Sequence, residues 1–146
     1  MKILLTIIFL SLLSSPSWSV SYDDLVERDG VYYKKFSDVP FSGKVTEIYK
    51  GSIKNGKREG AWISYYDNGQ LDFKGNYKNG KREGAWISYW SNGQLWYKGN
   101  YKNGKREGAW IDYERDLDLR DGGGTWVRRV LIKGTGMFRN GVKISD

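Results

Sequence analysis

The chain has 146 residues and a formal net charge of +7, with 19 glycines, 2 prolines and 16% aromatic residues. It contains no cysteine and no histidine, which excludes disulfides, thiol catalysis and the commonest general base and metal ligand. The frequent glycine and aromatic residues indicate tight turns between aromatic strands rather than a helical bundle. We predict no catalytic residue, cofactor or metal, and expect the protein not to be an enzyme.

Residues 1–19 have the features of an export signal. A positive Lys2 precedes an apolar stretch over residues 3–13, and small residues lead up to Ser19. That stretch is too short for a membrane span, which needs about 20 residues. We therefore expect cleavage after Ser19 and a periplasmic, cell-surface or secreted product, with an uncleaved anchor as the alternative. Residues 20–40 are predicted to form a lead-in or cap.

A repeat with a 24-residue period dominates residues 41–113. Residues 51–74 read GSIKNGKREGAWISYYDNGQLDFK, residues 75–98 are nearly the same, and residues 99–113 restart the unit. The pattern stops at residues 114–124, which are predicted to be a loop or insertion. Residues 125–146 are predicted to be a degenerate terminal repeat or cap, as the ends of repeat arrays commonly are.

Asn-Gly pairs recur through the repeats at alternating intervals of 13 and 11 residues. Between aromatic or β-branched runs, this pair is the strongest short-range hairpin signal, because both turn residues need positive φ. We predict an all-β fold, an elongated single-layer antiparallel meander of β-hairpin repeats. The turns are expected at 55–56, 68–69, 79–80, 92–93, 103–104 and 140–141.

The turn at 92–93 predicts one strand register. As a two-residue loop, it pairs Trp90 with Leu95 and Trp86 with Gly99, and paired residues share a face of the sheet. A tryptophan opposite a glycine fills the space that the glycine leaves. A three-residue loop would reverse this assignment of faces.

The turn at 79–80 predicts the same parity independently. It pairs Phe73 with Trp86 and Gly75 with Gly84, and so places the large rings together. We predict that this aromatic face binds a partner through Trp62, Tyr66, Phe73, Tyr77, Trp86, Trp90, Tyr97, Tyr101 and Trp110. Because a single-layer sheet has no second layer, we expect end segments, a second copy or a ligand to cover this face.

The opposite face is predicted to be basic and to carry Trp96 as well. Its candidate anion-binding residues are Lys74, Lys78, Lys81, Lys98, Lys102 and Lys105. A Lys-Arg-Glu triplet follows the turn in each repeat, at residues 57–59, 81–83 and 105–107. We interpret these triplets as solvated turns that discourage edge pairing, with a ladder of cations for a polyanion as the alternative.

The unit NGKREGAWISY, followed by NGQL and KGNY, resembles the bacterial variant of the MORN repeat. The resemblance covers residues 41–113 well and residues 125–143 poorly. It implies an elongated, twisted antiparallel sheet of consecutive hairpins. MORN-type arrays are associated with protein scaffolding and, less securely, with phospholipid headgroups, and some bacterial members are labelled as antitoxins of toxin–antitoxin systems.

Three functions follow from these features. The first is an exported module that binds or scaffolds another protein, or itself, through the aromatic face. The second is a binder of acidic phospholipid or polysaccharide through the lysines. The third is a cytoplasmic antitoxin, which requires that the export signal does not function. Nucleic acid is not an expected partner, since an exported protein rarely meets it.

Overall fold

The computed structural model describes residues 19–113, 119–120, 126–127 and 132–146. The predicted export signal lies outside the described residues except for Ser19, and the predicted insertion at 114–124 lies outside them except for residues 119–120. In the described part of the chain, no helix has the length and apolar character needed to cross a membrane.

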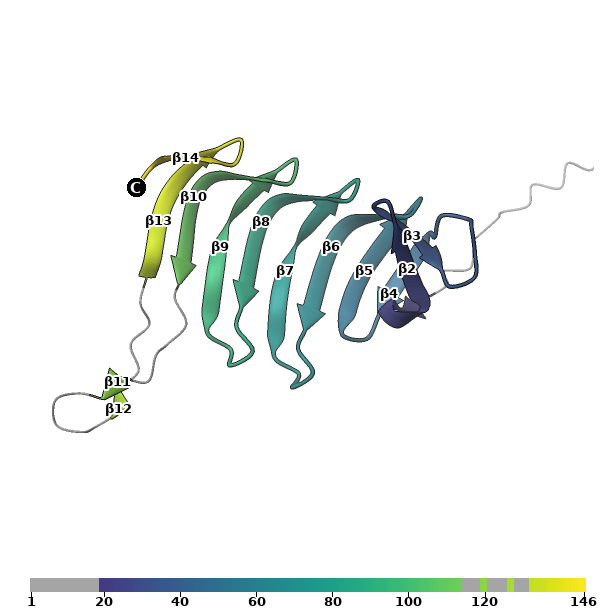
Figure 1. Cartoon of the computed structure of the whole chain (residues 1–146), viewed down its shortest axis with the longest axis horizontal. Coiled ribbons are helices and arrows are strands. Elements are labelled where there is room, and N and C mark those ends of the chain that lie inside the picture. The colour runs from purple at the N-terminus through teal and green to yellow at the C-terminus, as the bar shows by residue number, and fades with distance from the viewer. Residues whose placement is uncertain (1–18, 114–118, 121–125, 128–131) are drawn as a thin grey trace, which may run out of the picture.

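One open sheet of ten strands forms most of the molecule (Figure 1). Neighbouring strands are antiparallel, except that β1 runs parallel to β4 at one edge. The predicted all-β meander of hairpin repeats is therefore confirmed. In spatial order the strands are β1 (Ser19–Ser21), β4 (Gly43–Thr46), β5 (Tyr49–Lys54), β6 (Lys57–Tyr65), β7 (Leu71–Lys78), β8 (Lys81–Tyr89), β9 (Leu95–Lys102), β10 (Lys105–Tyr113), β13 (Ile132–Arg139) and β14 (Val142–Ser145).

The remaining elements are short. A 3-10 helix η1 follows β1, and the described residues also form two small two-stranded sheets. They are η1 (Tyr22–Asp24), the pair β2 (Leu25–Arg28) and β3 (Val31–Lys34), and the pair β11 (Leu119–Arg120) and β12 (Trp126–Val127).

The Asn-Gly turns are of two kinds. At residues 79–80 both φ angles are positive, +49° at Asn79 and +79° at Gly80, as in a two-residue type I′ turn. The turns at 55–56, 103–104 and 140–141 have the same geometry. At 92–93 only Gly93 has a positive φ, and the amides of Trp90 and Gly93 donate to the carbonyls of Gln94 and Trp90 at 2.8 Å. This is a three-residue loop, and the turn at 68–69 repeats it.

A bulge cancels the effect of each three-residue loop on the register. Leu95 pairs with Tyr89, so the predicted pairing with Trp90 is wrong. Trp96 is the extra residue of the bulge, and from the next residue onward the pairs are as predicted, with Trp86 opposite Gly99. The predicted reversal of faces therefore does not occur. Trp96 itself stacks on Trp90 at 4.3 Å between ring centroids, so its predicted place on the opposite face is also wrong.

A second bulge lies between β7 and β8. The residue pair after Asn76–Glu83 is Lys74–Ile87, so residues 84–86 all lie opposite the single residue Gly75. The predicted pairings of Phe73 with Trp86 and of Gly75 with Gly84 are wrong for this reason. Gly84 allows the bulge because it adopts φ +71°, a region that residues with a Cβ rarely occupy. The shift is an even number of residues, so the predicted face is still correct.

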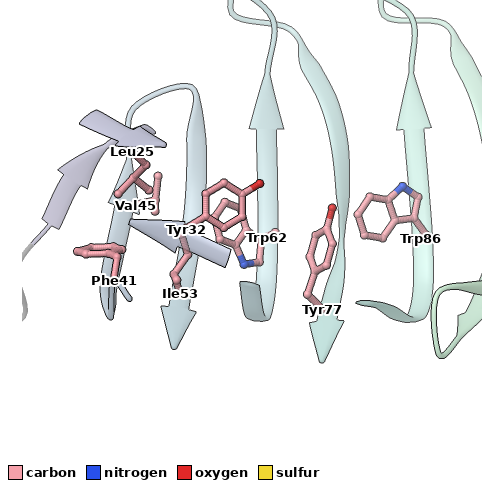
Figure 2. Packing of buried hydrophobic residues seen from close by; sticks show 8 residues of the cluster. All are labelled: Leu25, Tyr32, Phe41, Val45, Ile53, Trp62, Tyr77 and Trp86. Atoms are coloured by element: carbon pink, nitrogen blue, oxygen red, sulfur yellow. The ribbon is translucent and has the colours of Figure 1, made fainter. Parts of the chain in front are cut away.

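The β2–β3 hairpin covers the aromatic face at the N-terminal end of the sheet. The Tyr32 amide donates to the Gly56 carbonyl at 2.8 Å, and the Phe41 amide donates to the Tyr32 carbonyl at 2.8 Å. Leu25 and Tyr32 thereby join Trp62 in one buried cluster, which Figure 2 shows. An end segment thus covers the first repeat, as one of the expected alternatives proposed.

Candidate functional site

Three tryptophans, one in each repeat, are the most deeply buried rings of the aromatic face. They are Trp62, Trp86 and Trp110, with exposed fractions of 1%, 2% and 1%. Trp86 lies against the backbone of Gly75, where an added Cβ would overlap its ring. Gly51 and Gly99 have the same relation to the other two tryptophans. A single layer can bury such large rings because glycine lets them lie directly on the neighbouring strand.

The other rings of this face pack against the tryptophans. Around Trp86, the Phe73 ring is stacked at 5.0 Å between centroids, and Tyr77 and Tyr101 meet it edge-on at 5.3 and 5.8 Å. Tyr77 is 9% exposed, and the remaining predicted partner-binding residues are half-buried, namely Tyr66, Phe73, Trp90, Tyr97 and Tyr101. The structure therefore joins seven of the nine predicted residues in one chain of ring contacts, namely Trp62, Phe73, Tyr77, Trp86, Tyr97, Tyr101 and Trp110. Trp90 stacks on Trp96 instead, and the Tyr66 hydroxyl donates to the Tyr89 carbonyl.

Three arginines cover the tryptophans, and the sequence analysis missed them. The guanidinium carbons lie over the tryptophan rings, at 4.9 Å for Arg58 on Trp62, 4.5 Å for Arg82 on Trp86 and 4.1 Å for Arg106 on Trp110. A cation over an aromatic face is attracted by the ring electrons, more strongly where water is excluded. The signal was present, because each arginine is four residues before its tryptophan and so has the same strand parity.

Tyrosine hydroxyls accept hydrogen bonds from the first two arginines. Arg82 donates to Tyr101 Oη at 2.8 Å. Arg58 donates to the hydroxyls of Tyr77, Tyr22 and Tyr32 at 2.9, 2.7 and 3.0 Å. Burial by itself would lower the pKa of Arg58, but these tyrosines raise it above its usual value. Burial also raises the pKa of the Tyr32 hydroxyl, so the pair stays as a cation beside a neutral phenol.

The last arginine has a different acceptor. Phe138 takes the place that Tyr101 has in the repeat before it, and a phenylalanine has no hydroxyl to offer. Asp112 stands where the other repeats have serine, and its two carboxylate oxygens each accept from Arg106 at 2.8 Å. The second change therefore compensates for the first, so each of the three half-buried arginines has an acceptor.

Asp112→Ser, which restores the residue of the other repeats, should lower the free energy of unfolding by about 1–2 kcal/mol. The reason is that Arg106 would lose both carboxylate oxygens while staying half-buried, the two side chains being only 30% and 28% exposed. Urea unfolding followed by circular dichroism measures this. As the control, Asp38→Ser removes the exposed partner of Arg28 and should leave the unfolding midpoint nearly unchanged. Equal effects of the two changes would contradict the compensation.

The glutamates of the triplets bind the next hairpin turn. Glu59 accepts from the Asn79 amide at 2.7 Å, and Glu83 accepts from the Asn103 amide at 2.8 Å. Glu107 binds the last turn in the same way. The interpretation of the triplet as a solvated turn is therefore wrong for its arginine and glutamate, which link one repeat to the next.

The opposite face of the sheet, which we call the open face, has an open groove of about 900 Å³ across β5 to β10. Small residues line it, with exposed alanines at 61, 85 and 109 between strand glycines. Lysine and isoleucine alternate along it from strand to strand. This row consists of Lys50, Ile63, Lys74, Ile87, Lys98 and Ile111, each paired with the next across the sheet.

The six predicted anion-binding lysines divide into two groups. Lys74 and Lys98 line the groove and are exposed. The other four flank two-residue turns as cross-strand pairs, Lys78 with Lys81 and Lys102 with Lys105. The open face therefore presents a mixed apolar and basic groove, and the turns present a separate basic edge.

Comparison with protein families identifies the repeat. Residues 58–79 and 82–103 match the family described as the MORN repeat variant. Residues 58–103 are two MORN repeats of the variant family. Each matched MORN repeat begins at one of the arginines that lie over a tryptophan and ends at the turn of the following hairpin. MORN repeats are typically non-catalytic modules. No curated protein sequence matches the chain significantly.

Proposed function

We propose that this MORN-repeat chain is an exported, non-catalytic module that binds another protein on its open face. The observation that carries the proposal is the groove of about 900 Å³ across six strands. The aromatic face is less suited to a partner than the sequence analysis expected, because its rings are largely covered by one another and by the arginines. The open face keeps its small and apolar side chains in contact with solvent.

The composition of the groove favours a protein partner over a purely anionic surface. Ile63, Ile87 and Ile111 supply apolar area, and apolar area removed from water drives most protein–protein association. The lysines between them supply orientation and specificity. The turn lysines would suit an acidic lipid or polysaccharide, but the glutamates of the same turns offset part of their charge.

Export is part of the proposal, and its support is the sequence of residues 1–19 alone. The apolar stretch at residues 3–13 and the small residues before Ser19 fit a cleaved signal. The mature chain would then begin at Val20, which pairs with Val45 in the sheet.

Photo-crosslinking in living cells tests the proposed face. A photoreactive amino acid at Ala85, an exposed residue in the groove, should give a discrete crosslinked band with a protein. The same amino acid at Asp67, exposed in a three-residue loop, should not. The crosslinked band should be found in the cell envelope or the medium. N-terminal sequencing of the protein should give Val20 as its first residue.

Two results would count against the proposed function. One is crosslinking from Trp96, which is 38% exposed on the aromatic face, with none from Ala85. The other is that the protein is found in the cytoplasmic fraction with residues 1–19 still attached, which would favour the antitoxin alternative.

A further inference from the structure

We infer that the groove takes one extended acidic segment of its protein partner. The segment would cross the strands in a polyproline II conformation and present an acidic side chain at every third residue. This inference rests on the proposed function and adds the charge, the conformation and the spacing of what is bound.

Charge complementarity indicates the sign of the charge on the bound segment. The three lysines of the groove, Lys50, Lys74 and Lys98, are exposed, and none of the described residues that line the groove is acidic. Glu83, which pairs with Asn76 at the rim, accepts a hydrogen bond from a turn amide. An acidic segment therefore meets cations along the whole groove, whereas a basic one would meet like charges, which is costly at an interface.

The spacing of the lysines gives the conformation. They lie on β5, β7 and β9, two strands apart, so successive lysines are about 9.6 Å apart along the sheet. A polyproline II helix has three residues per turn and rises about 9.3 Å in that turn, so every third side chain faces a lysine. A β-strand repeats its face after about 6.7 Å and does not match.

The floor of the groove suits a backbone that has no internal hydrogen bonds. Alanines at 61, 85 and 109 and the strand glycines let another main chain approach closely. The exposed amide side chains of Asn76 and Asn100 lie between them and offer hydrogen bonds. Polyproline II backbone groups are otherwise satisfied only by solvent, so these amides replace water on binding.

Fluorescence anisotropy with designed peptides tests the charge and the spacing. The first probe is a fluorescein-labelled peptide of four Glu-Pro-Pro units, titrated with the purified protein at physiological salt. The second has the same number of glutamates at every fourth residue, as Glu-Pro-Pro-Pro units, and the third replaces glutamate with glutamine. We expect the first to bind at least tenfold more tightly than either of the others.

Matched charge reversals test the place of binding. Lys74→Glu with Lys98→Glu changes two groove lysines on β7 and β9, and Lys78→Glu with Lys102→Glu changes two turn lysines on the same strands. Both double variants change the net charge equally, and all four side chains are exposed, so the sheet should remain folded. We expect at least tenfold weaker binding of the Glu-Pro-Pro peptide for the groove pair and less than threefold for the turn pair.

Several outcomes would overturn the inference. Equal losses from the two double variants would mean that the peptide follows the general positive field, and equal binding of the two glutamate peptides would exclude the spacing. Binding to phosphatidylserine vesicles that depends on the turn lysines, without peptide binding, would assign a lipid instead. If no glutamate peptide binds while Ala85 still crosslinks to a protein, this inference fails and the proposed function stands.

Discussion

Replacing Trp86 with alanine is expected to lower the free energy of unfolding by about 3–5 kcal/mol, the usual loss when a buried large aromatic residue is truncated. The ring is 2% exposed and lies between Phe73, Tyr77 and Tyr101, with Arg82 above it. Its removal leaves a cavity that the sheet has no second layer to fill. Guanidinium unfolding followed by far-ultraviolet circular dichroism measures the loss.

The same substitution should change the shape of the unfolding curve. Each repeat of such an array touches only its neighbours, so a weak central interface divides the array. We expect a broader transition, or two transitions, in place of one. Trp96→Ala is the matched control, because Trp96 is 38% exposed and its stacking on Trp90 contributes only about 1 kcal/mol. A loss for Trp86→Ala no larger than this control would contradict the structural role of the tryptophans.

The turn spacing and the strand parity were sufficient to predict the sheet and the common face of the tryptophans. Local detail was harder, because the same Asn-Gly pair begins two kinds of loop. At 79–80 the residues on either side are lysines and the loop has two residues, whereas at 92–93 Ser91 joins the turn and the loop has three. Asp67 occupies the position of Ser91 in the other three-residue loop, so this difference between the two kinds of turn was visible in the sequence.

The arginines over the tryptophans show a different limit of sequence reasoning. Strand parity places Arg82 on the same face as Trp86, whereas the charge of its side chain favours exposure to solvent. The positions of Tyr97 and Tyr101, whose hydroxyls accept from Arg82, decide between these two arrangements. Those positions depend on the pairing of β8 with β9, in which Tyr101 lies opposite Gly84 and Tyr97 opposite Ser88. The groove of the open face could not be predicted from the sequence either, because its shape depends on how the small alanine side chains of several strands come together in three dimensions.

Gly75→Ala is expected to lower the free energy of unfolding by about 3 kcal/mol, although it adds one methyl group to a strand. In most strands alanine is at least as favourable as glycine. Whether Gly75→Ala raises or lowers the free energy of unfolding therefore depends on the Trp86 ring above residue 75. A Cβ at residue 75 would overlap three carbons of Trp86, and Phe73 and Tyr77 prevent that ring from moving away. Gly134→Ala is the control, because no atom of the described residues lies within 4 Å of its added Cβ, and its effect should be near zero.

A double variant separates this overlap from any general weakening of β7. With Trp86→Ala already present, no ring remains for the added methyl group to meet, so Gly75→Ala should then cost little. Residues in direct contact show such non-additivity, and we expect a coupling of about 2 kcal/mol between the two sites. Simple addition of the two losses would mean that glycine serves the strand for another reason. Strong coupling would establish the packing of a tryptophan on a glycine as the unit that lets a single layer bury its own core, and so leaves the other face of the sheet open to the partner that we propose.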